Sequence, residues 1–180
     1  MTNNQRLVFI ALLASQAVII SLLERAIPFP FAVAPGAKLG LANMITIMAL
    51  YTLSTKDTMH VIGIRITLAS LLGGTISTLM YSGAGALLSF IGMVLMKKIG
   101  GNKISIIGVS VVGAVLHNVG QLLIASMVAN TWTVMLYLPV LSMIGILSGI
   151  AIGIAANYIL THVNRLNYYK DLQTFQVERG

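Results

Sequence analysis

The stretch that decides the fold is VMLYLPVLSMIGILSGIAIGIAANYILT, which runs from Val134 to Thr161 and contains no charged residue. The hydrocarbon core of a bilayer is about 30 Å thick, and a helix needs about 20 apolar residues to cross it. This stretch is therefore predicted to span a membrane. Small side chains recur along it at intervals of three and four residues, which favours close helix packing inside a bundle. They are Ser142, Gly145, Gly149, Gly153 and Ala156.

Five further apolar stretches precede this one, at residues 7–27, 39–53, 59–81, 83–96 and 104–129. The second and fourth are short for a full crossing at 1.5 Å per residue, so they are expected to be tilted or re-entrant. The sequence thus predicts an all-α integral membrane protein. We expect a compact bundle of about six transmembrane helices over residues 1–162 and a polar cytoplasmic tail over residues 163–180.

The composition agrees with this class. Of the 180 residues, 57% are hydrophobic and 8% are charged, whereas a soluble domain carries about 25% charged residues. A soluble enzyme, a disordered chain and a secreted disulfide scaffold are excluded. The chain has no Cys, so it has no disulfide, no thiolate nucleophile and no Cys-based metal site.

Lys and Arg are unequally distributed between alternate loops, and cytoplasmic loops carry the excess in membrane proteins. One set of alternate segments contains Arg6, Lys56, Lys97, Lys98, Lys103, Arg165, Lys170 and Arg179. The loop between the first two spans contains only Arg25 and Lys38, and Arg65 lies inside the third span. Both termini are therefore predicted to be cytoplasmic. The net charge of +7 then requires no nucleic-acid partner.

Polar residues at membrane depth are costly, and each one is a candidate functional residue. Arg65 shares a helix face with Ala69 and Gly73, so it is expected to point into the bundle, either as a structural brace or as a coupling residue. His117, Asn118 and Gln121 lie deep in the fifth span. Three such groups together favour a ligand-binding or relay role, since each needs a hydrogen-bond partner.

A second group of polar residues surrounds the loop between the first two spans. It consists of Glu24, Arg25, Lys38 and Asn43, and in the chosen orientation it faces the same half of the membrane as His117 and Gln121. Together these residues predict an outward-facing, positively charged pocket that suits a carboxylate or a phosphate. The alternative for Glu24 and Arg25 is a simple ion pair at the level of the lipid headgroups.

Several catalytic signatures are missing from the sequence. It contains no G-x-x-x-x-G-K-[ST] loop for ATP. Its carboxylates, Glu24, Asp57, Asp171 and Glu178, are scattered, whereas prenyl-diphosphate chemistry uses clustered Asp residues to hold Mg²⁺. The His residues have no metal-ligand spacing. We therefore expect a protein that is not an enzyme and that holds neither a metal nor a cofactor.

The motifs PGAKLGLAN at residues 35–43 and GAVLHNVGQ at residues 113–121 resemble those of a family of small bacterial membrane proteins. This family is called heptaprenyl diphosphate synthase component I, or Gx transporter, and is similar to the substrate-binding S components of energy-coupling factor (ECF) importers. Arg65 fits its pattern in the third span. The resemblance covers about residues 7–162 and implies a multi-pass protein of the bacterial cytoplasmic membrane.

The resemblance also implies a substrate site near the outer face and a first helix that packs on a transmembrane coupling subunit, which two cytoplasmic ATPases drive with ATP. The expected partner face is the small-residue stripe Ala11, Ala14, Ser15 and Val18, where Ala11-x-x-x-Ser15 departs from the Ala-x-x-x-Ala pattern. Internal packing is the alternative for that stripe.

The leading hypothesis is an S component that captures a small anionic vitamin or an isoprenoid-related precursor. One rival is a self-sufficient facilitator or proton-coupled carrier, with His117 as a relay. The other is a non-catalytic membrane subunit of a prenyl-lipid enzyme.

Overall fold

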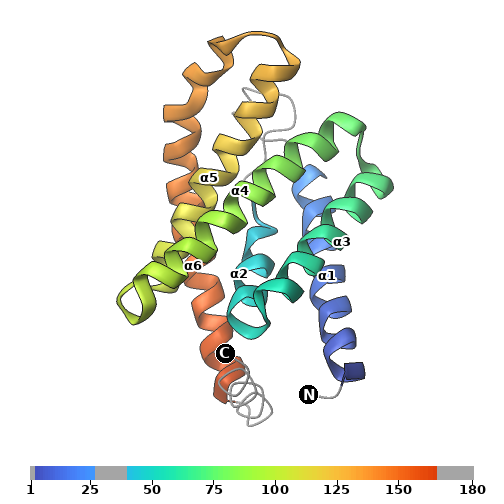
Figure 1. Cartoon of the computed structure of the whole chain (residues 1–180), viewed down its shortest axis with the longest axis vertical. Helices are drawn as coiled ribbons and strands as arrows, with labels where there is room; N and C mark the ends of the chain where they lie inside the picture. Colours follow the sequence, from blue (N-terminus) through green and yellow to red (C-terminus); the bar gives the residue numbers. More distant parts are fainter. Residues whose placement is uncertain (1–2, 27–39, 166–180) are drawn as a thin grey trace.

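The computed structural model describes residues 3–26 and 40–165, and the regular structure within them is helical (Figure 1). Short 3-10 turns, η1 (Gly101–Lys103) and η2 (Trp132–Tyr137), precede the last two helices. The α-helices are α1 (Asn3–Ala26), α2 (Asn43–Thr52), α3 (Thr55–Gly73), α4 (Ile76–Gly100), α5 (Ile106–Val128) and α6 (Leu138–Arg165).

The boundary between α3 and α4 corrects the sequence prediction of spans at 59–81 and 83–96. The chain breaks earlier, because α3 ends at Gly73 and the hydroxyl of Thr75 accepts from the backbone N–H of Thr78 to cap α4. Ser54 and Ser105 cap α3 and α5 in the same way. A Ser or Thr hydroxyl satisfies an N–H that the first turn leaves without a partner, which fixes where these helices begin.

Four helical stretches are long and apolar enough to cross a membrane: Asn3–Arg25, Ile76–Gly100, Ile106–Val128 and Trp132–His162. With ten residues, α2 is about 15 Å long at 1.5 Å per residue, which is half of a bilayer core. The helix α3 carries the buried Arg65. Four of the six predicted spans, at 7–27, 83–96, 104–129 and 134–161, thus correspond to such helices. The expectation that the fourth is too short for a full crossing was wrong, because α4 has 25 residues. The crossing of the other two stays a prediction.

The short helix α2 lies in the centre of the bundle (Figure 1). Its residues Ile47, Ala49 and Leu50 are buried in two clusters, one shared with α1 and α3 and the other with α3, α4, α5 and α6. These contacts place the N-terminal end of α2 beside the middle of α3.

The small-residue stripe of α6 packs inside the bundle, as the sequence predicted. A Cβ on Gly149 would lie 2.8 Å from the Cα of Val111, and one on Gly153 would lie 2.7 Å from the Cα of Ile107. Because these distances leave no room for a side chain, the glycines let α6 approach the backbone of α5.

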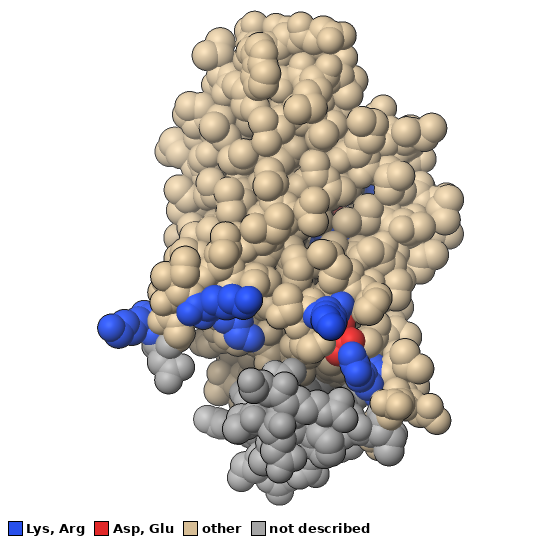
Figure 2. Space-filling model, in the orientation of Figure 1, with Lys and Arg blue, Asp and Glu red and all other residues tan. Residues whose placement is uncertain are grey.

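Basic side chains gather at one end of the molecule (Figure 2). This end contains the first turns of α1 and α3 and the last turn of α4, with Arg6, Lys56 and Lys98 exposed. Here the Nε of Arg6 donates to Asp57 at 2.8 Å and its Nη2 completes an ion pair, so α1 is joined to α3. Burial by itself raises the pKa of Asp57, but hydrogen bonds from Arg6 and Ser54 and the charge of Arg6 outweigh it and lower the pKa.

Candidate functional site

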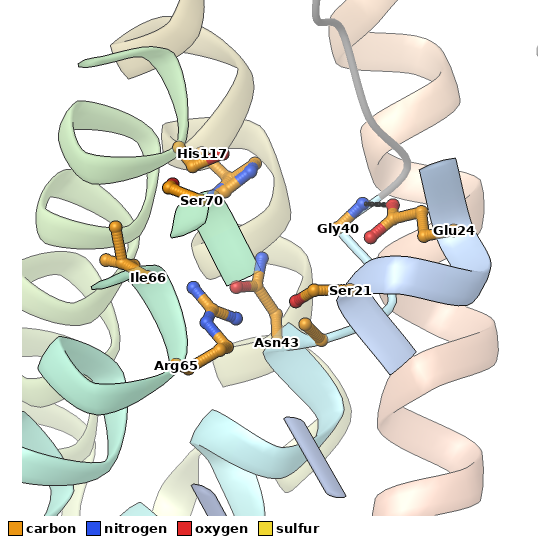
Figure 3. A pocket seen from close by; sticks show the side chains of 10 residues that line it. Ser21, Glu24, Gly40, Asn43, Arg65, Ile66, Ser70 and His117 are labelled. Atoms are coloured by element: carbon orange, nitrogen blue, oxygen red, sulfur yellow. Dashed lines mark hydrogen bonds between the residues drawn. The ribbon is translucent and has the colours of Figure 1, made fainter. Parts of the chain in front are cut away.

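Arg65 is the charged residue around which the candidate site is built. It lies on α3, its side chain is only 4% exposed, and it points into a pocket (Figure 3). The carboxylate of Glu24 lines the same pocket, and its charge acts on Arg65. The sequence prediction that Arg65 faces the interior is confirmed.

Asn43 faces Arg65 across the pocket from the first turn of α2 (Figure 3). Its side chain is 2% exposed, and neither its Nδ2 nor its Oδ1 has a hydrogen-bond partner in the described part of the chain. Buried polar groups normally have partners, so an amide with both atoms unpaired is unusual. Asn43 therefore offers one donor and one acceptor to the pocket.

Glu24 binds the backbone at the start of α2. Its Oε1 accepts from the backbone N–H of Gly40 at 2.5 Å and of Leu41 at 3.2 Å (Figure 3). Gly40 has a φ of +79°, in the left-handed region that glycine adopts without strain. The carboxylate thus fixes the backbone that enters α2 to the last turns of α1.

The pocket lies between α1, α2, α3, α4 and α5. Its volume is about 340 Å³, part of which is open to the surroundings. Its lining is mostly polar and consists of Ser21, Glu24, Gly40, Ala42, Asn43, Arg65, Ile66, Ser70, Ser82 and His117. The N-terminal end of α2, where Ala42 supplies no side-chain cap, adds positive partial charge to this lining.

The three polar residues of α5 do not act as one group. His117 lines the pocket, and the amide nitrogen of Gln121 donates to its Nε2 at 3.2 Å, one turn behind it. Asn118 turns away to α6, where its Nδ2 donates to the backbone oxygen of Leu141 at 2.7 Å. Neighbours in a helix sequence point about 100° apart, which separates Asn118 from the pocket that His117 faces.

Arg25 and Lys38 complete the predicted set. Arg25 does not line the pocket, because its guanidinium lies over the glycines that end α3. A Cβ on Gly74 would be 3.1 Å from its Nη1, and one on Gly73 would be 3.5 Å away. Lys38 lies outside the described residues.

Sequence reasoning missed Ser21, Ser70 and Ser82 as lining residues. Ser21 precedes Glu24 by three residues, so a shared helix face was a usable signal for it. Ser70 and Ser82 gave no such signal, because their position depends on how α3 and α4 pack.

The proposed partner stripe of α1 divides into two faces. Ala14 is 1% exposed and Val18 is 6% exposed, because both pack inside this chain. Ala11 and Ser15 are exposed, and the hydroxyl of Ser15 donates to the backbone oxygen of Leu12. Only the second face is available to a partner.

The pocket has the chemistry of a binding site for a small polar molecule. It combines one guanidinium, one carboxylate, one amide, one imidazole and several hydroxyls. Within residues 3–26 and 40–165 no group of three or more His, Cys, Asp or Glu side chains is arranged to hold a metal ion.

Comparison with known proteins gives one result. The family model described as heptaprenyl diphosphate synthase component I matches residues 13–159. No curated protein and no solved structure matches the chain.

Proposed function

The chain belongs to the heptaprenyl diphosphate synthase component I family, and we propose that it is a membrane-embedded binding component that captures a small anionic molecule for import. In its specific form, the proposal is an S component of an ECF-type importer in the bacterial cytoplasmic membrane. Its substrate would be an anionic vitamin or an isoprenoid-related precursor. Its role is binding, not catalysis.

The observation that carries this proposal is Arg65, a guanidinium buried in a pocket beside Asn43, whose two amide atoms have no partner among the described residues. Charged residues inside membrane proteins mark substrate paths. Arg binds carboxylates and phosphates in a bidentate geometry, so an anionic ligand suits this pocket.

The position of the pocket supports capture from outside. At 1.5 Å per residue, Glu24 lies about 27 Å along α1 from Arg6, which is at the basic end. Basic residues favour the cytoplasmic side of a membrane, so the pocket would lie in the outer half. Both termini would then be cytoplasmic.

Import against a gradient needs an energy source, and this chain carries no ATP-binding motif. We propose that a transmembrane coupling subunit and two cytoplasmic ATPases supply it. The docking face would be the exposed side of α1 around Ala11 and Ser15.

Co-purification tests the partners. The tagged full chain, expressed in its own cells and extracted in mild detergent, is expected to bring down the coupling subunit and the ATPases. Ala11→Trp should remove them, whereas Ala151→Trp, at an exposed alanine of α6, should retain them. Absence of both partners from the wild-type sample would refute the importer.

A second candidate is a non-catalytic membrane subunit of a prenyl-lipid enzyme, and the family match favours it. This candidate predicts that a prenyl diphosphate synthase co-purifies in place of the ATPases. Synthase activity in membranes should then fall when the chain is deleted and return when it is restored.

A further inference from the structure

We infer that the pocket at Arg65 recognises a small monoanion that carries its own hydrogen-bond donor, as a hydroxy acid does, and that it rejects a diphosphate. This inference rests on the proposed function only in treating the pocket as a ligand site. It narrows the class of ligand and disfavours an isoprenoid diphosphate.

The first argument is the pairing of donors and acceptors. The guanidinium of Arg65 is matched by a carboxylate. Beside it, Asn43 has an unpaired Nδ2, which needs an acceptor, and an unpaired Oδ1, which needs a donor. A bare carboxylate satisfies the Nδ2 but leaves the Oδ1 unpaired. A hydroxyl group next to the carboxylate satisfies both.

The second argument is the charge of the lining. Arg65 and Glu24 line the pocket together, so its positive charge is already offset in part. Glu24 is fixed in place by the backbone N–H groups of Gly40 and Leu41. A monoanion fits this balance, whereas a diphosphate would bring more than one negative charge close to a fixed carboxylate.

The third argument is the small number of apolar side chains. In the described lining these are Ala42 and Ile66, and the other lining residues are polar or glycine. A prenyl chain needs a long apolar wall to leave water favourably. Two apolar side chains do not form such a wall, so the recognised group is compact.

The test uses the purified full chain in nanodiscs with three probes: glycolate, acetate and inorganic pyrophosphate. Glycolate and acetate differ by one hydroxyl group. Binding is measured by saturation-transfer NMR titration, with circular dichroism at 222 nm as a check that each variant is folded. We expect glycolate to bind about tenfold more tightly than acetate, because acetate leaves the Asn43 Oδ1 unpaired. Pyrophosphate is expected to bind most weakly.

Two pairs of variants locate the effect. Asn43→Leu should reduce the preference for glycolate to about twofold or less, whereas Asn118→Leu should retain it, because Asn118 bonds to Leu141 outside the pocket. Arg65→Gln should abolish binding of both carboxylates, and Arg65→Lys should weaken it. Arg6→Gln, at the basic end, should leave it unchanged.

Three outcomes would overturn the inference. They are equal binding of glycolate and acetate, tighter binding of pyrophosphate than of glycolate, and no binding of any probe. These results are independent of the co-purification experiment. A protein that binds glycolate through Arg65 and Asn43 but brings down no ATPase refutes the importer and leaves the ligand class standing. A protein that brings down its ATPases but prefers pyrophosphate refutes the inferred ligand class and leaves the importer standing.

Discussion

Replacing Asn43 with Leu should make the ligand-free protein more stable. Leu has the same branched arrangement of side-chain heavy atoms as Asn, and none of them is polar. Asn43 is 2% exposed, and its Nδ2 and Oδ1 are both unpaired within the described residues. A buried polar group without a partner destabilises a fold by about 1–3 kcal/mol, and an apolar group of similar shape removes that penalty.

The expected gain in the free energy of unfolding is therefore about 1–3 kcal/mol. For a chain of this size it corresponds to a rise in Tm of about 2–10 °C. Thermal unfolding is followed by circular dichroism at 222 nm in detergent, without ligand. The variant should at the same time lose the preference for glycolate.

Asn118 provides a matched control because it is equally buried, at 4% exposed, but its amide is bonded to the backbone oxygen of Leu141. Asn118→Leu removes that bond and leaves the carbonyl without its donor, so it should lower stability by about 1–3 kcal/mol. The same substitution at two buried positions is thus expected to change Tm in opposite directions. If Asn43→Leu lowers Tm as Asn118→Leu does, the Asn43 amide is a structural group and the reasoning fails.

Three further predictions concern residues around the pocket and at the basic end. Gly40→Ala should cost about 1–2 kcal/mol, measured by thermal unfolding, because a Cβ is strained at a φ of +79°. Lys97→Met should destabilise the protein by about 1–3 kcal/mol, because the Nζ of Lys97 donates to the Leu50 backbone oxygen at 2.6 Å. The control Lys98→Met, at an exposed position, should change the free energy of unfolding by no more than about 0.5 kcal/mol. The folded-state pKa of Asp57 is lowered, so its stabilisation should be complete above its unfolded pKa of about 3.9 and disappear as the pH falls through the folded value. Chemical unfolding between pH 6 and pH 2 should show this loss in wild type and not in Asp57→Asn.

The sequence predicted the helices whose apolar runs have clear ends. The run at 104–129 lies within two residues of α5, because Ser105 provides a cap and polar residues follow. The boundary between α3 and α4 was wrong because Gly73-Gly74-Thr75 lies inside an uninterrupted apolar run. At this boundary the cap that the hydroxyl of Thr75 provides for α4 decided where the helix begins, and the hydrophobic pattern did not.

The candidate site was predictable as a set of residue types but not as a geometry. Arg65, Asn43 and His117 stood out as polar groups in apolar helices, and the structure brings all three to one pocket. Their meeting depends on α2 lying in the centre of the bundle, which no local pattern encodes. Asn118 was equally conspicuous in the sequence, yet helix geometry directs it to α6.

The helix α1 lines the pocket near one end and also carries the exposed face around Ala11. It is linked to its neighbours near both ends. Glu24 holds the backbone of Gly40 near one end, and Arg6 holds Asp57 near the other, about 27 Å away along the axis. Between these links the buried side of α1 packs against α2 and α3. A ligand that pairs with Arg65 would contact α3, which packs directly against α1. A shift of α3 on ligand binding would therefore move α1 through that contact. Under the proposed function, a partner docked at Ala11 therefore needs no separate element to respond to the occupied pocket.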